Sequence, residues 1–263
     1  MTELGVAHLT ALELPPGDLI HGAAQAGFRS VGLRVHPATR GGPAYPTVVG
    51  TRAHDALRGI LDGEGMRLND IEFVPLTPDI DVPSLASILE AGADLGASSV
   101  TVSGDDEDAG RLTANFAALC DLATGFGLRV DIEFMRWRAI GNLHQAAGIV
   151  TRAGRPNGAI LLDALHLSRS GGVPADLRGL PPNLLRSVQL CDAPARRPET
   201  DDAVIAEARE GRLPPGEGAL PLRDLLTMLP KDVALSVEMP MPQLNAAERL
   251  HRAYRSAERL LGP

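Results

Sequence analysis

The segment Gly127-Leu128-Arg129-Val130-Asp131-Ile132-Glu133-Phe134 has the pattern of a buried β-strand that follows a helix. Its apolar side chains alternate with the carboxylates of Asp131 and Glu133, so a strand here carries one apolar face and one acidic face. Gly127 stands where the preceding helix would end, in the left-handed conformation that glycine adopts at low cost. Because the apolar face is expected to meet helices, Glu133 is predicted on the opposite face, near the carboxyl end of the strand.

The same unit, a short apolar run followed by a longer stretch rich in Ala, Leu and Glu, recurs along the whole chain. The runs with strand character are Leu4–Leu9, Ser30–Val35, Arg67–Val74, Ser98–Ser103, Leu128–Phe134, Ala159–Asp163, Ser187–Leu190 and Val233–Glu238. Clear helical patterns occupy Thr51–Gly63, Val82–Leu95, Asp108–Phe126, Gly141–Ala153 and Asn245–Leu261. Eight strands that alternate with helices, without a linker or a break in composition, predict one parallel α/β domain over residues 1–263.

Two architectures satisfy this pattern, and the stretch after the first predicted strand distinguishes them. An open, doubly wound sheet normally carries a G-x-G-x-x-G loop there. In this chain the stretch is Ala7-His8-Leu9-Thr10-Ala11-Leu12, which has no glycine. A closed barrel of eight such units needs roughly 250 residues, and the chain has 263. The sequence therefore predicts a single (β/α)8 TIM barrel.

The composition argues against several classes of protein. Lys and Arg number 25 against 33 Asp and Glu, and aromatic residues make up 3%, whereas nucleic-acid binding needs a basic face and stacking rings. No apolar run approaches the ~18 residues of a membrane span, and the N-terminal residues do not resemble a signal peptide. Cys120 and Cys191 cannot form a disulfide framework. We expect a cytoplasmic protein that acts on a small molecule, as a monomer or a homo-oligomer.

Active sites of such barrels lie at the carboxyl ends of the strands, and four consecutive predicted strands end there with an oxygen-bearing side chain. These side chains are Glu133, Asp163, Gln189 and Glu238. Three carboxylates at one mouth repel one another, and a divalent cation between them would relieve the repulsion. All-oxygen ligation favours Mn²⁺ or Mg²⁺ over zinc. Each residue alone is more often a helix cap or an ordinary polar group, so the prediction depends on the joint pattern.

Arginines are also predicted near this mouth. Arg34, Arg136 and Arg212 together would suit a substrate that bears a carboxylate or a phosphate. An unpaired charge on the inward face of a strand is costly, so Arg34 is expected either to bind such a group or to pair with Glu72 or Asp70. For Arg136 a solvated position in a loop is an equal alternative.

Five short motifs, in order along the chain, resemble those of the xylose isomerase-like TIM-barrel superfamily of sugar phosphate isomerases and epimerases. They are Val130-Asp131-Ile132-Glu133-Phe134, Asp163-Ala164-Leu165-His166, Gln189-Leu190-Cys191-Asp192, Arg212-Leu213-Pro214-Pro215-Gly216-Glu217-Gly218 and Ser236-Val237-Glu238. The superfamily includes ketose 3-epimerases, inosose isomerases and dehydratases, 3-dehydroshikimate dehydratases and endonuclease IV. That last branch binds three metals through additional histidines, which this chain lacks. The resemblance runs over essentially the whole chain but does not identify a particular substrate.

The resemblance implies one divalent cation with four ligands: Glu133, Asp163, Gln189 and Glu238. Relatives more often have histidine where this chain has Gln189. The glutamine makes the site all-oxygen, which disfavours zinc and leaves the identity of the metal open, with Mn²⁺ or Mg²⁺ expected. The resemblance also implies that His166 and Arg212 contact oxygen atoms of the substrate. The sequence assigns no role to His8, His36 or Cys191.

The chemistry that the resemblance implies begins with a keto-sugar, an inosose or a related polyhydroxy carbonyl compound. A metal-stabilised enolate forms, with Glu133 and Glu238 as the acid/base pair and as metal ligands. Return of the proton gives an isomerase or epimerase, which is the expected function. Loss of a β-hydroxyl group gives a dehydratase, which is the alternative. A non-catalytic or partner-dependent barrel is a second alternative, and the complete set of ligands argues against it.

Overall fold

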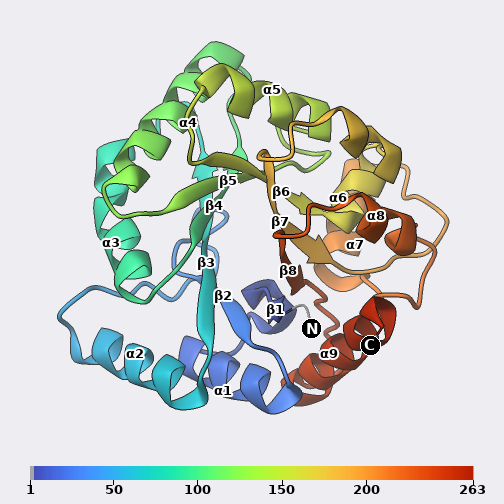
Figure 1. Ribbon diagram of the computed structural model, residues 1–263, viewed down its shortest axis with the longest axis horizontal. Helices are drawn as coiled ribbons and strands as arrows, with labels where there is room; N and C mark the ends of the chain where they lie inside the picture. The colour runs from blue at the N-terminus through green and yellow to red at the C-terminus, as the bar shows by residue number, and fades with distance from the viewer. Residues whose placement is uncertain (1–2, 263) are drawn as a thin grey trace.

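Eight parallel strands close into a barrel in the order in which they occur along the chain, as the computed structural model of residues 3–262 shows (Figure 1). The last strand pairs with the first, from Leu4 against Leu235 to Val6 against Val237. The predicted (β/α)8 barrel is thereby confirmed. The strands are β1 (Leu4–Val6), β2 (Ser30–Arg34), β3 (Arg67–Leu76), β4 (Ser99–Gly104), β5 (Arg129–Glu133), β6 (Gly158–Asp163), β7 (Leu185–Leu190) and β8 (Ala234–Val237).

Helices form a ring around the barrel in Figure 1. They are α1 (Pro16–Ala26), α2 (Arg52–Glu64), α3 (Ala86–Asp94), α4 (Ala109–Thr124), α5 (Leu143–Ala153), α6 (Ala164–Arg169), α7 (Asp201–Glu210), α8 (Leu222–Met228) and α9 (Ala246–Leu261). Three short 3₁₀ helices complete the described chain: η1 (His8–Ala11), η2 (Val82–Leu85) and η3 (Pro174–Gly179). No helix within residues 3–262 has both the length and the apolar character that a membrane crossing requires.

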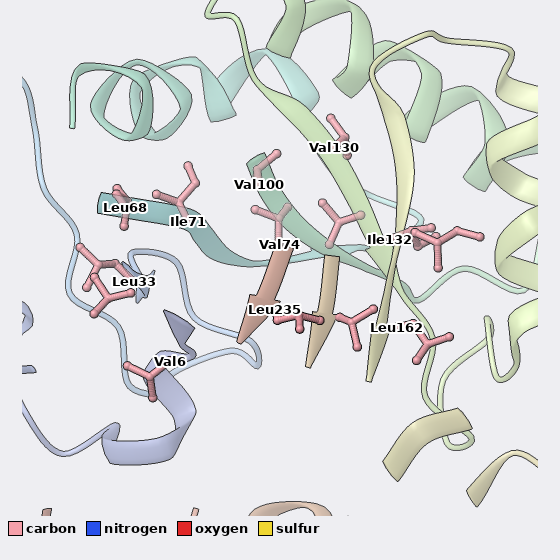
Figure 2. Close-up of a cluster of buried hydrophobic side chains, with 14 of the residues drawn as sticks. Val6, Leu33, Leu68, Ile71, Val74, Val100, Val130, Ile132, Leu162 and Leu235 are labelled. Atoms are coloured by element: carbon pink, nitrogen blue, oxygen red, sulfur yellow. The ribbon is translucent and has the colours of Figure 1, made fainter. Parts of the chain in front are cut away.

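The apolar face of each strand packs against the helices, as the alternation in β5 predicts. Val130 and Ile132 are fully buried, and Figure 2 shows them among apolar side chains from other strands. The opposite face of β5 points into the barrel. There Asp131 accepts two hydrogen bonds from Arg129, each of 2.7 Å, and one from Ser187 of β7. Branched aliphatic side chains usually fill the interior of a barrel of this kind. At this level of the present barrel the interior side chains, Asp131 of β5 and Ser187 of β7, are polar instead.

Two elements differ from the prediction by more than two residues at an end or by a break. The first strand ends at Val6 instead of Leu9, because the chain turns into η1, where the Thr10 hydroxyl donates to the carbonyl of Val237 and accepts from the amide of Met239. The predicted helix Val82–Leu95 is split into η2 and α3. Pro83 lies in the first turn of η2 and has no N–H to contribute to a regular α-helix.

Candidate active site

The four side chains predicted as metal ligands all lie at the carboxyl end of the barrel. Glu133 ends β5, Asp163 ends β6, Gln189 lies in β7, and Glu238 directly follows β8. Asp163 and Gln189 are register partners on adjacent strands, so they stand at the same level. Every one of the four is buried, with at most 5% of its surface exposed.

Arg212 lies between two of these carboxylates. Its Nη1 atom is 2.5 Å from Oδ2 of Asp163, and its Nη2 atom is 2.6 Å from Oε2 of Glu238. The side chain is 1% exposed. Its remaining contacts are with the carbonyl of Ala208 and the sulfur of Cys191. The guanidinium group therefore binds the predicted ligand set directly.

His166 is the second functional residue that the structure adds to this cluster. Its backbone amide donates to Oδ1 of Asp163 at 3.0 Å, because Asp163 caps the N-terminus of α6. Its Nε2 atom lies 3.6 Å from Oε1 of Glu133, and the Trp137 ring packs edge-on against the imidazole. Burial lowers the pKa of His166 to about 4, so the ring is neutral at pH 7. A neutral imidazole can serve as a metal ligand or as a hydrogen-bond partner of substrate.

Burial and crowding raise the pKa of two of the glutamates. The pKa of Glu133 lies well above its ordinary value because of burial and of the neighbouring charges on Glu238 and Asp163. Burial raises the pKa of Glu238 to about 8, although Arg212 opposes the rise. Asp163 behaves differently: burial opposes its ionisation, but the charge and hydrogen bond of Arg212, together with the hydrogen bond from the His166 amide, outweigh burial and lower its pKa. Without a further positive charge, burial and crowding thus favour the protonated forms of both glutamates.

These residues fit a divalent cation. Glu133, Asp163 and His166 form a cluster whose ligand atoms lie within 4.8 Å of one another. The Oε1 atom of Gln189 is buried and has no hydrogen-bond partner among residues 3–262. A buried carbonyl oxygen without a donor is costly, and coordination of a cation would satisfy it. Glu238 is outside this group of three and is linked to its Asp163 through the Arg212 guanidinium, which donates to both carboxylates.

A pocket of about 310 Å³ opens directly above the cluster, a size within the usual range for small-molecule sites. The floor includes Glu133, His166, Arg212 and Glu238. Apolar side chains form much of the wall: Leu9, Leu12, Phe73, Met135 and Trp137. The long segment 35–51 between β2 and α2 supplies Ala38, Thr39, Gly42 and Pro43 to the same wall.

The arginines predicted near the mouth divide into two groups. Arg34 and Arg212 line the pocket, but Arg136 does not. The Arg136 guanidinium is tied to the Asp201 carboxylate at 2.9 Å and to the carbonyl of Glu199. Arg34 pairs with Glu72 at 3.1 Å, which was one of the two alternatives for it, and both side chains are buried.

Arg138 is a pocket residue that sequence reasoning did not select. It lies two residues beyond Arg136, lines the pocket and pairs with Asp105 at 2.8 Å. Both arginines follow β5, and no sequence signal separates them. The turn after the strand decides which one faces the pocket, through the bonds of Met135 with Arg138 and Ile140.

The three residues without a predicted role have structural contacts. His8 accepts a hydrogen bond from the Arg34 amide at 2.8 Å through Nδ1, and its Nε2 faces the carbonyl of Leu14. Burial lowers its pKa, and these two contacts match a neutral ring that steadies the end of β2. His36 contacts the Phe73 carbonyl at 3.0 Å. Cys191 is buried against Arg212, and burial raises the pKa of its thiol to about 12.

A family model described as xylose isomerase-like TIM barrel matches residues 20–260 of the chain. The protein belongs to this family. In sequence, 3-dehydroshikimate dehydratase of Pseudomonas aeruginosa is 30% identical to this xylose isomerase-like barrel over 116 residues. That alignment covers 44% of the chain and 18% of the dehydratase. The chain therefore spans less than two thirds of the length of this relative.

Solved structures of the family share the fold over nearly the whole chain. The IolI protein, whose crystal structure contains a zinc atom, superposes with a TM-score of 0.81 at 19% identity, over 99% of this chain and 98% of its own. D-psicose 3-epimerase from Clostridium cellulolyticum H10, solved with D-tagatose, gives a TM-score of 0.72 at 13% identity, over 99% and 97%. The dehydratase and the epimerase are enzymes, and by their names they catalyse different reactions.

Proposed function

We propose that this protein is a divalent-metal-dependent isomerase or epimerase of a polyhydroxy carbonyl compound, such as a keto-sugar or an inosose. One observation carries the proposal: Glu133, Asp163, Gln189 and Glu238 lie at the carboxyl ends of four consecutive strands, and two of them, Glu133 and Glu238, line a pocket of about 310 Å³. The family supports it, because its named members include an epimerase that was solved with a ketose.

The cation would be held by Glu133, Asp163, Gln189 and Glu238, with His166 as a further donor. Four oxygen donors favour Mn²⁺ or Mg²⁺, whereas a ligating His166 nitrogen would suit zinc as well. When bound, such a cation polarises a carbonyl group and acidifies the adjacent C–H bond.

Glu133 and Glu238 would move the proton. They come from β5 and from the end of β8, so they approach the pocket floor from different sides of the barrel. One glutamate, ionised, takes the proton from the carbon next to the carbonyl group. The other, protonated, returns a proton to the opposite face of that carbon, and the two exchange roles for the reverse reaction. The raised pKa of Glu238, about 8, suits a group that holds a proton near neutral pH.

The surrounding side chains would orient the substrate and exclude water. His166, neutral and next to Glu133, can bind a hydroxyl group of the substrate. Trp137 and Phe73 cover the pocket with apolar surface, which strengthens the electrostatic interactions inside it. Arg34 and Arg138 line the same wall, each in an ion pair with one carboxylate, Glu72 or Asp105, and their guanidinium groups would suit a carboxylate or phosphate on the substrate.

A dehydratase is the second candidate, because 3-dehydroshikimate dehydratase of Pseudomonas aeruginosa resembles 44% of the chain at 30% identity. The first step would be the same removal of a proton from carbon. The outcome would then differ, since a protonated Glu133 or Glu238 would help a β-hydroxyl group to leave as water.

The deciding experiment measures metal content first and chemistry second. Purified wild-type protein should contain about one divalent ion per chain by mass spectrometry, and Glu133→Ala/Glu238→Ala should contain none. A matched control, Glu90→Ala/Glu107→Ala, removes two exposed carboxylates and should keep the metal. Keto-sugars, inososes and 3-dehydroshikimate are then incubated in D₂O. Deuterium incorporation with an isomer as product supports the first candidate, and an unsaturated product that absorbs ultraviolet light supports the second. Metal without turnover of any of them indicates the non-catalytic alternative, and wild type without metal, even after Mn²⁺ is added, rejects the proposal.

A further inference from the structure

Arg212 has almost no capacity left for a substrate. A guanidinium group has five N–H bonds. In Arg212 four of them point to the Ala208 carbonyl, the Asp163 carboxylate, the Cys191 sulfur and the Glu238 carboxylate. Two of these partners are proposed metal ligands. The geometry thus differs from the role in substrate binding that the resemblance implies for this arginine.

Hydrogen bonds fix the backbone next to Arg212, and the fixed backbone holds the guanidinium group in this position. Leu213 and Asp192 exchange backbone hydrogen bonds of 2.8 Å in a short antiparallel bridge. The buried Asp192 carboxylate accepts bonds from the amides of Ala193, Gly216 and Leu220. A β-carbon at Gly218 would lie 2.4 Å from Oδ1 of Asp192, so the loop can approach this carboxylate only with glycine there. The loop that follows Arg212 is therefore held rigidly, and it fixes the direction of the Arg212 side chain.

The charge that Arg212 contributes decides which cation suits the site. Glu133, Asp163 and Glu238 carry a formal charge of −3 when ionised, and the buried guanidinium reduces it to −2. A nearby pair, Arg34 and Glu72, is neutral in sum. Net charge is costly in a buried site. A divalent cation completes a neutral cluster when both glutamates are ionised and leaves one positive charge when one of them is protonated, whereas a trivalent cation adds a further positive charge in either state.

We propose that Arg212 is a positioning residue that orients Asp163 and Glu238 and, as a fixed positive charge, tunes the ligand set to divalent cations. The inference rests on the proposed metal site and deepens it. Residues that hydrogen-bond to metal ligands commonly set their orientation and the affinity for the metal. A guanidinium group that bonds to two of the ligands also reduces the negative charge of the ligand set by one unit.

The test compares Mn²⁺ with Tb³⁺, a trivalent ion that also prefers oxygen ligands. Calorimetry gives the affinity for Mn²⁺, and luminescence gives the affinity for Tb³⁺. Arg212→Met removes the charge and should raise the Tb³⁺/Mn²⁺ affinity ratio by roughly tenfold or more, because the extra charge of Tb³⁺ no longer meets the guanidinium. Arg212→Lys keeps the charge and should stay within about threefold of wild type. Circular dichroism shows whether Arg212→Met folds. If it does not, Arg212→Gln, which also removes the charge, replaces it in the same measurement.

The outcomes separate this inference from the proposed function. An unchanged ratio in both charge-removing variants, with normal Mn²⁺ binding in wild type, overturns the role of Arg212 and leaves the metal site standing. Binding of Mn²⁺ only after the charge is removed rejects the metal-dependent function, and supports Arg212 as the cation of the cluster. Absence of binding in wild type and in every variant overturns both.

Discussion

Asp70 fills the space beside the backbone of Gly32, its register partner on the neighbouring strand. A β-carbon at residue 32 would lie 2.8 Å from Oδ1 of Asp70. That oxygen belongs to a buried carboxylate, which accepts hydrogen bonds from Thr101 and Asn69. The glycine therefore makes room for an acidic group inside the barrel, below the candidate active site.

Gly32→Ala should lower the free energy of unfolding by about 1–3 kcal/mol, because the new methyl group overlaps Asp70 and the barrel wall resists displacement. Urea unfolding measures the loss. In the Asp70→Ala background the same substitution should cost less by at least about 1 kcal/mol. Gly59→Ala is the control: Gly59 lies in α2 with nothing within 4 Å of its β-carbon position, and alanine there should not destabilise the protein. Equal losses at Gly32 in both backgrounds would contradict the overlap.

Asp70 also predicts how stability depends on pH. Burial, followed by the charge of Glu72, raises its pKa from 3.8 to about 7. Between these values the folded protein holds a proton that the unfolded chain has released, so this group lowers stability progressively as the pH rises from about 4 to about 7. Asp70→Asn removes this effect. As the pH rises over that window, the free energy of unfolding of Asp70→Asn should therefore increase relative to that of wild type, by up to about 4 kcal/mol.

The measurement is urea unfolding of wild type and Asp70→Asn at pH 4, 5.5 and 7.5. Titrating groups that do not interact with Asp70 contribute equally to both proteins and cancel in the difference. Asp62→Asn, at an exposed position in α2, should show a difference from wild type that does not change with pH. A difference for Asp70→Asn that stays constant over the window would show that Asp70 is already ionised in the folded protein.

Gln189→His should shift the metal preference of the site toward zinc. The substitution replaces the buried Oε1 oxygen with an imidazole nitrogen at the same level as Asp163. Nitrogen donors favour zinc over manganese, and we expect the Zn²⁺/Mn²⁺ affinity ratio to rise about tenfold or more. Dialysis against a mixture of both ions, followed by metal analysis, gives the ratio. Gln243→His places the same group at an exposed position and should leave it unchanged. If both variants behave alike, Gln189 is not a ligand.

Arg138→Gln should raise KM for substrates with a carboxylate about tenfold and leave KM for neutral polyhydroxy ketones unchanged. Arg138 lines the pocket, and a charge-assisted hydrogen bond to an anion contributes more than a neutral one. Arg136→Gln is the matched control, because that guanidinium is bound to Asp201 outside the pocket. Steady-state kinetics on one charged and one neutral substrate give the KM of each variant for both. Equal losses in the two variants would instead assign Arg136 to the substrate site, as the sequence predicted.

The sequence predicted the barrel and the position of the acidic side chains at the carboxyl ends of the strands, because both depend on local periodicity. Alternation within Arg129–Phe134 is enough to direct Glu133 inward once helices cover the apolar face. The bridge from Arg212 to Asp163 and Glu238 has no such local signal. Its partners are 49 and 26 residues away, and its geometry depends on the loop that Asp192 clamps. The direction of Arg136 and Arg138 depends likewise on one irregular turn.

The Gln189 oxygen, which has no hydrogen-bond partner in the part of the chain that the structure describes, has an evolutionary consequence. Glutamine and histidine codons differ in their third base alone, so a single point mutation exchanges the two residues at this position. The exchange would leave the neighbouring carboxylates, the register of β6 with β7 and the barrel itself in place. With the proposed metal site, a lineage with this sequence would shift its metal preference in one mutational step that keeps the fold.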